Sequence, residues 1–168
     1  MANCPQTLAG ITLDCTTSQG GIKKVWIADY SAPKPELVDG KIAFDDASPF
    51  KGFEFRRGTA SMTHTLTADE TTGVNYVTTE LSLVFTKMDT KKRIEMAALS
   101  IGQLAVIVLD SNGVYWYLGY DDYVSASAGG GETGTAKGDR NAYTLTLKTE
   151  SATYPYEVEA QAVSGLEK

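Results

Sequence analysis

The side chains best suited to chemistry in this chain are His64, Cys4 and Cys15. A thiol beside an imidazole can form a nucleophile–base pair, and a lone imidazole can act as a general base where a nucleophile and an orienting acid adjoin it. His64 falls on the apolar side of an alternating segment, which favours a packed, structural histidine. We therefore predict no catalytic residue. A small hydrolase using His64 stays as a hypothesis that His64→Ala would test.

Metal and redox chemistry have few candidate ligands. One histidine excludes a His-rich site, and two cysteines are too few for a four-cysteine zinc site. Cys4 and Cys15 either form a local disulfide or stay reduced, and a reducing compartment favours the second. Asp110-Ser-Asn-Gly113 resembles the start of a calcium loop, but the distal ligands are missing, so we interpret it as a turn. We predict no metal and no cofactor.

The run Gly129-Gly-Gly-Glu-Thr-Gly134 invites comparison with a phosphate-binding loop. Such a loop needs Lys and Ser/Thr directly after its last glycine, whereas Thr135 and Ala136 follow here. A nucleotide site is therefore not expected at this position.

Aromatic side chains offer a different alternative, a carbohydrate-binding or adhesion module of a phage or cell surface. An exposed sugar platform on a β protein would be built from residues such as Trp26, Tyr115, Trp116, Tyr117 and Tyr120. Alternating aromatic residues are more often part of a core. Glycan binding that is lost in Trp116→Ala would favour the platform.

Composition and charge limit the classes of protein to which this chain can belong. The 168 residues have 42% hydrophobic and 21% charged side chains, as expected for a folded chain, and a net charge of −6. Negative charge disfavours tight binding to nucleic acid. The longest apolar run, Leu104–Leu109, is too short to span a bilayer. We expect no signal peptide and no membrane anchoring, because the N-terminus is neither basic nor hydrophobic.

The pattern of elements predicts a mainly β, single-domain chain over residues 1–168. Period-two alternation and β-branched or aromatic content indicate antiparallel strands near 22–30, 41–44, 53–57, 59–67, 74–88, 104–109, 114–120, 142–148 and 156–160. The apolar segment 104–109 should lie centrally in a sheet that is covered on both faces. Asn112-Gly113 supplies the positive φ angles of a hairpin turn.

One helix is predicted, over about 89–102. Asp89 can cap it, and Ile94, Ala97, Ala98 and Ile101 form one apolar stripe that would pack on a sheet. Gly102 can end the helix in the left-handed conformation.

Three segments look irregular. They are an N-terminal arm (1–21), a Pro-rich connection (31–52) and a Gly-rich segment (121–141). The Gly-rich segment has little apolar surface to offset the entropy of ordering it, so we expect residues 123–141 to be mobile and protease-sensitive in the monomer and protected after assembly.

From residues 80–148 the chain resembles tail tube proteins of tailed bacteriophages and related tail-ring subunits. The resemblance lies in the long hairpin ending at Leu81-Ser-Leu-Val-Phe85, the single helix, the hairpin through Asn112-Gly113, and Thr133-Gly-Thr-Ala-Lys-Gly-Asp139 leading into Ala142-Tyr-Thr-Leu-Thr-Leu147. The segment Leu8–Cys15 with Gly20–Lys23 is similar to structural proteins of phages of gut bacteria, including the crAss-like group. The Pro-rich stretch 31–52 is longer than the resemblance implies, which suggests a subunit of a variant tail ring rather than of the main tube.

The resemblance implies a β-sandwich or partly closed barrel flanked by one helix. It also implies a virion protein, made in the host cytoplasm, whose rings, commonly of six copies, stack into a conduit for DNA that passes without specific binding. Its partners would be copies of itself and other tail or connector proteins. The candidate subunit-interface residues are Gly129, Gly130, Gly131, Thr133, Gly134, Lys137, Asp139, Arg140, Asp69, Glu70, Lys91 and Arg93.

Overall fold

The computed structural model describes residues 7–30 and 34–166, and these residues form two packed β-sheets with one long helix. Sheet A has the strand order β2-β3-β11-β8-β7-β1-β4, with bounds Glu36–Val38, Lys41–Ala43, Tyr156–Val158, Tyr115–Leu118, Leu104–Asp110, Ile22–Asp29 and Lys51–Phe53. Sheet B has the order β5-β6-β10-β9, with bounds Ser61–Asp69, Val74–Thr86, Ala142–Ser151 and Ser125–Glu132. The predicted mainly β sandwich with one helix is confirmed.

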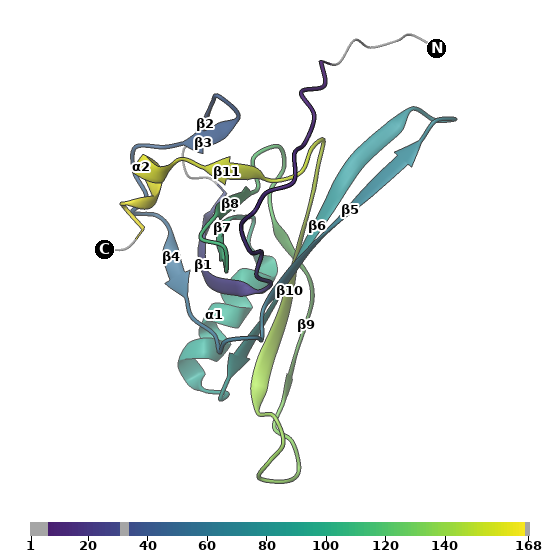
Figure 1. Cartoon of the computed structure of the whole chain (residues 1–168). Coiled ribbons are helices and arrows are strands. Elements are labelled where there is room, and N and C mark those ends of the chain that lie inside the picture. Colours follow the sequence, from purple (N-terminus) through teal and green to yellow (C-terminus); the bar gives the residue numbers. More distant parts are fainter. Residues whose placement is uncertain (1–6, 31–33, 167–168) are drawn as a thin grey trace.

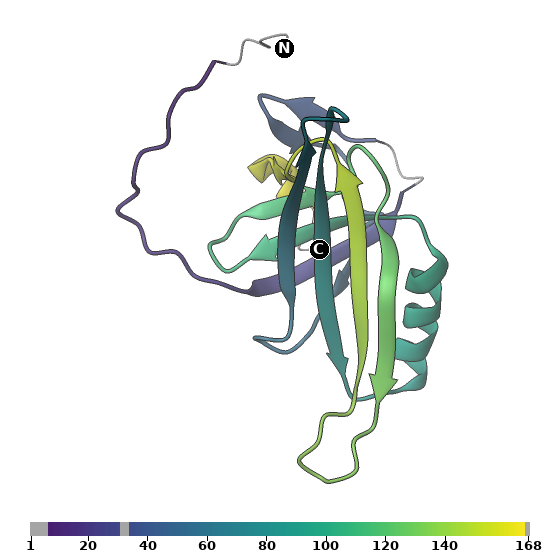
Figure 2. The ribbon, with the colours of Figure 1, turned by 90° about the vertical axis from the view of Figure 1, so that its right-hand side faces the viewer.

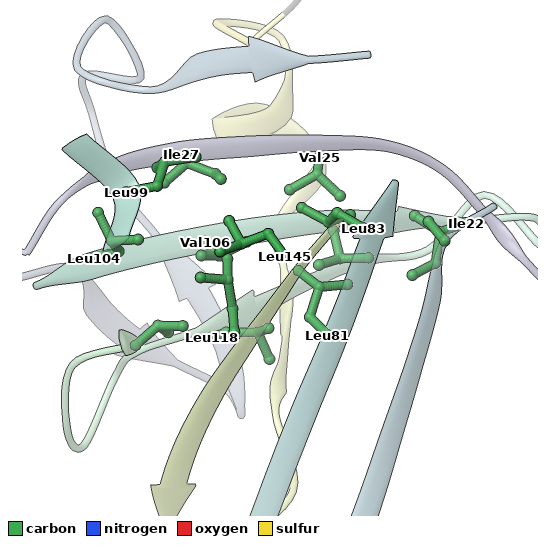
Figure 3. Close-up of a cluster of buried hydrophobic side chains, with 14 of the residues drawn as sticks. Ile22, Val25, Ile27, Leu81, Leu83, Leu99, Leu104, Val106, Leu118 and Leu145 are labelled. Atoms are coloured by element: carbon green, nitrogen blue, oxygen red, sulfur yellow. The ribbon is translucent and has the colours of Figure 1, made fainter. Parts of the chain in front are cut away.

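The strands of the two sheets cross steeply, and the core lies where they cross (Figure 2). Strand pairs are antiparallel except β3 with β11, which is parallel. Strict alternation places Leu81, Leu83 and Leu145 of sheet B on one face, against Val25 and Val106 of sheet A (Figure 3). The upper part of the β5–β6 hairpin projects beyond sheet A (Figure 1), so its residues stay exposed on both sides.

Strand β7 is covered on both faces, as its unbroken apolar sequence predicts. Val106 and Val108 face sheet B, whereas Ala105 and Ile107 join a second core. A second helix, α2 (Ala160–Val163), and the chain around Ala47 cover this second core. The long helix therefore does not cover sheet A, contrary to expectation.

The long helix, α1 (Thr90–Ile101), begins and caps as predicted but packs through a different face. Asp89 accepts a hydrogen bond from the backbone N–H of Lys92 at 2.8 Å. Leu99 is buried and Met96 packs beside it, whereas Ile94 and Ile101 are 54% and 88% exposed. The apolar stripe expected to pack is thus exposed. Instead, the side of α1 that has Leu99 packs against the core between the two sheets.

Two turn predictions need correction. Gly102 ends α1 with φ −77° and ψ 152°, an extended rather than left-handed conformation. In the β7–β8 hairpin only Gly113 has positive φ, at +85°. Its turn is stabilised by the Asp110 carboxylate, which accepts hydrogen bonds from the N–H groups of Asn112 and Val114 and from Trp116 Nε1. Asp110 therefore serves the turn, as predicted.

The segments expected to be irregular are more ordered than predicted. Within 31–52, whose first three residues lie outside the described ranges, the structure has β2, β3 and the start of β4. Within 121–141, residues 125–132 form β9, paired with β10. The arm is irregular, as expected, over its described residues 7–21, with bends at Cys15 and Thr16. Within the described ranges no helix is long and apolar enough to cross a membrane.

The packing of sheet B on sheet A can be tested by replacing leucine with alanine at a buried and at an exposed position. Leu81 is fully buried, and Leu66, on the paired strand β5, is 51% exposed. Leu81→Ala should lower the free energy of unfolding by about 2–5 kcal/mol, because it leaves a cavity. Leu66→Ala should change it by no more than about 0.5 kcal/mol. Urea titration followed by tryptophan fluorescence would measure both, and equal losses would contradict the packing of sheet B on sheet A.

Candidate functional site

The candidate interface residues lie at two opposite ends of sheet B. Asp69 ends β5 and Glu70 begins the turn to β6, which forms the tip of the projecting hairpin (Figure 1). The Gly-rich segment ends β9 and continues into the turn 133–141 at the other end, close to the start of α1 (Figure 2). Strand β6 joins the two ends over 13 residues, a span of roughly 40 Å at about 3.3 Å per residue.

The turn 133–141 is built around the carboxylate of Asp139. Its Oδ2 accepts hydrogen bonds from the backbone N–H of Thr135 at 2.8 Å, from Thr135 Oγ1 at 3.0 Å and from the backbone N–H of Ala136 at 2.7 Å. These bonds to Ala136 and Thr135 lower the pKa of Asp139 from its ordinary value. The turn thus has internal bonds of its own, which the sequence analysis did not anticipate.

Gly134 allows this turn to close. Its φ is +68°, and a Cβ atom at this position would lie 2.3 Å from Cβ of Asp139. Arg140 donates a hydrogen bond from Nε to the carboxylate of Glu132, which ties the two sides of the turn together. Lys137 lies at the exposed apex.

The glycines of β9 fit close neighbours. A Cβ at Gly131 would lie 3.1 Å from the Tyr143 ring and 3.2 Å from Cε of Met88, and one at Gly129 would lie 3.3 Å from the carbonyl oxygen of Thr144. Glycine has low strand propensity, but at these positions a side chain would displace its neighbours. Residues 129–131 are therefore part of the sheet, with exposed surface along the strand.

At the hairpin tip, the carboxylate of Asp69 shapes its own turn. Its Oδ1 accepts hydrogen bonds from the N–H groups of Thr71 at 2.8 Å and Thr72 at 3.4 Å. These bonds, the one to Thr71 first, lower its pKa, so the tip stays anionic. Glu70 is exposed beside it.

At the other end, the start of α1 is basic. Lys92 pairs with Asp89 at 2.6 Å, which lowers the pKa of Asp89, while Lys91 and Arg93 are exposed. Counted over residues 87–93 and 132–141, this end has six basic side chains against three carboxylates, a net charge of +3. The two ends of sheet B therefore have opposite charge.

The face of sheet B turned away from the core is rich in hydroxyl groups, a feature that the sequence analysis did not single out as a candidate surface. The strand registers put ten hydroxyl side chains on it: Ser61, Thr63, Thr65, Thr67, Thr78, Ser82, Thr86, Ser125, Thr144 and Thr146. Within these four strands its one basic residue is Lys148, which pairs with Glu150 at 2.8 Å. The signal was available as threonines at alternate positions in β5 and β10, the two strands that flank β6.

His64 makes packing contacts. Its Nδ1 lies 2.9 Å from Thr79 Oγ1, and its ring meets Tyr154 edge-on with centroids 6.0 Å apart. Partial burial lowers its pKa, which favours the neutral ring. Cys15 is exposed on the arm and Cys4 lies outside the described residues, so their pairing stays an open prediction.

The aromatic residues do not form an exposed platform. Trp26 and Tyr117 are buried in the second core, and Tyr115 and Tyr120 pack against it. Trp116, with its side chain on the opposite face of β8, packs against the first core. Burial raises the pKa of Tyr117 to about 12. The arrangement that motivated the carbohydrate-binding alternative is therefore absent among these five side chains.

A hollow of about 570 Å³ lies beside the second core, near Phe44, Phe50 and Tyr117. Its carboxylates include Asp46, which accepts two hydrogen bonds from Ser48; these lower its pKa and hold it ionised. Among the described residues no group of three or more His, Cys, Asp or Glu side chains could hold a metal ion.

No protein family, no curated protein sequence and no solved structure matches this chain. Its function is therefore inferred from its own surfaces.

The turn 133–141 can be tested by a matched pair of substitutions. Gly134→Ala should increase amide exchange at Thr135 and Ala136 about tenfold, because the left-handed conformation costs an L-residue about 1–2 kcal/mol and the added Cβ meets Asp139. Gly138→Ala should leave exchange unchanged, since nothing lies within 4 Å of a Cβ there. Hydrogen-exchange mass spectrometry would measure both. Equal protection in the two variants would contradict a turn that depends on Gly134.

Proposed function

We propose that this chain is a virion structural protein of a tailed bacteriophage, a self-assembling tail tube or tail-ring subunit whose rings form a conduit for DNA ejection. The observation that carries the proposal is the pair of end strands of sheet B, although α1 packs beside one of them, β9. Strands β5 and β9 each pair on one side only. Neither contains Pro, Lys or Arg, the residues that protect exposed strand edges from pairing.

The strand directions favour closure into a ring. Successive strands of sheet B are antiparallel, and an even number of strands leaves β5 and β9 running in opposite directions. A neighbour related by rotation about an axis along the strands would place its β5 antiparallel to β9, continuing the sheet. Such head-to-tail contacts close into a ring when the rotation from one copy to the next returns to the first copy. Six copies, the number that the resemblance implies, would give 24 strands (six times four), well above the roughly 16–18 of barrels with aqueous channels.

The hydroxyl-rich face suits the lumen of such a ring. DNA adheres to proteins mainly where lysine and arginine neutralise phosphates. On this face the single lysine is balanced by Glu150 and also lies near Glu80, which contributes to its raised pKa. A surface of hydroxyl groups with a slight excess of carboxylates would let DNA pass without holding it.

The charges at the two ends support stacking of rings. The hairpin tip has Asp69 and Glu70, and the end at 87–93 and 132–141 has a net charge of +3. Rings stacked along the strand direction would bring the acidic tip of one copy to the basic end of the next. Opposite charges steer such contacts and fix their orientation.

Size-exclusion chromatography combined with electron microscopy of the purified chain tests the proposal. We expect rings or tubes whose central channel is wide enough for duplex DNA. A chain that stays monomeric at high concentration in all salts would count decisively against it.

The lumen assignment is tested with added lysines. In assembled rings, Thr144→Lys with Thr146→Lys should increase the affinity for a short DNA duplex several-fold and steepen its salt dependence, because the ring concentrates the new charges around one axis. Gln161→Lys with Ser164→Lys adds the same charge at α2, away from sheet B, and should have a much smaller effect. Fluorescence anisotropy across a salt series measures both. Equal gains would place the hydroxyl-rich face outside the channel.

A further inference from the structure

The N-terminal arm has an apolar surface that its own chain does not cover. Leu8, Ile11 and Leu13 are between 89% and 103% exposed. The arm is attached to the body just before β1. There the N–H of Gln19 donates to Asn112 Oδ1 at 2.8 Å, and the carbonyl oxygen of Gly21 accepts from the N–H of Ser111 at 3.0 Å. Before that point it bows away from both sheets (Figure 2), and its residues 7–20 are exposed. Its residues 7–20 pair with no strand, and Gly10 bends the backbone with φ +79°, so its backbone and its apolar side chains both lack a partner in the single copy.

A groove that matches these needs lies between β4 and α1. It has a volume of about 360 Å³, within the range of roughly 300–1,000 Å³ typical of binding clefts. Phe53, Phe85, Met96 and Leu99 give it an apolar floor, and lysines and carboxylates of both elements surround it.

The groove also offers backbone hydrogen-bonding groups. β4 is the end strand of sheet A, paired with β1 alone. Four successive residues, 51–54, line the groove. Because successive side chains of a strand point to opposite faces, this lining indicates that the groove runs along the free edge of β4. An extended peptide can add to such an edge, with hydrogen bonds to the backbone and pockets for alternate side chains.

We propose that residues 7–14 of one copy add as a further strand to the free edge of β4 in a neighbouring copy, with Ile11 and Leu13 in the groove. The inference rests on the proposed self-assembly and adds a second contact between copies, separate from the edges of sheet B. Ile11 and Leu13 are two residues apart, so in a strand they share one face, while Thr12 points the other way. The exposed helix face with Ile94 and Ile101 is the weaker site, because it offers the arm no backbone partner.

Disulfide cross-linking between two full-length variants tests the contact. Both are made with Cys4→Ser and Cys15→Ser, so that the introduced cysteines are the only ones. One variant has Ile11→Cys on the arm and the other has Glu95→Cys on the groove. The matched control is Ile94→Cys, one residue away on the exposed side of α1. Mixing and mild oxidation should give several-fold more covalent dimer with Glu95→Cys than with Ile94→Cys.

A second pair of variants tests the face of the arm. Ile11→Asp should reduce the cross-linking and weaken self-association, because it would place a carboxylate on the apolar floor. Thr12→Asp adds the same charge on the other side of the strand and should preserve both. Equal effects of the two substitutions would overturn the proposed orientation.

The remaining outcomes separate this inference from the proposed function. Rings in electron micrographs with equal or no cross-linking at the two helix positions would overturn the arm contact and leave the tail-ring function intact. Placing Ile11→Cys and Glu95→Cys on one chain checks the remaining alternative. An efficient intrachain disulfide in a monomer would show that the arm binds its own groove, which overturns exchange between copies. A chain that neither assembles nor cross-links would overturn both proposals.

Discussion

Sheet B depends on one constraint, the strict alternation of side chains along β6 and β10. Leu81, Leu83 and Leu145 point to sheet A and form the core, and hydroxyl groups occupy the other face. A shift of register by one residue would exchange the two faces, burying threonines and exposing leucines. The long paired segment from Thr86 with Ala142 to Val77 with Ser151 fixes that register. The pairing of β6 with β10 therefore determines both the apolar interface between the sheets and the hydroxyl-rich outer face of sheet B.

Much of this architecture could be predicted because its signals are local. The β5–β6 hairpin, β7 with its two buried faces, and α1 with its Asp89 cap follow from period, turn residues and capping chemistry within short windows of sequence. The interface candidates at 69–70 and 133–140 lie in segments whose turn composition is visible in the sequence, and the structure places them at the ends of the strands of sheet B. What their contacts are in an assembly remains a proposal.

The predictions were wrong where contacts between segments distant in the sequence determine the structure. The sequence of β9 is typical of a linker, because alanine and glycine have low strand propensity. Its pairing depends on β10 and on the space that Gly131 leaves for the side chains of Tyr143 and Met88. The helix α1 has apolar residues on more than one side, so its periodicity suits two packing faces. The structure buries Leu99 and leaves Ile94 exposed, because the long side chains of Met96 and Leu99 reach the gap between the sheets.

A single copy leaves unpaired strand edges on both sides of sheet B, an uncovered apolar arm and an open groove beside β4. Each would be covered by an element that the same chain supplies, and β5 and β9 have the antiparallel directions that a rotated neighbour requires. Assembly must overcome the repulsion between copies that each have a charge of −6. Salt screens that repulsion beyond about 8 Å under physiological conditions, whereas strand pairing and apolar contact act at closer range. Two independent contacts between neighbours would also be cooperative, because forming one raises the effective concentration for the other. Rings held by both edges and arms would therefore tolerate more repulsion around a negative channel than rings held by either contact alone.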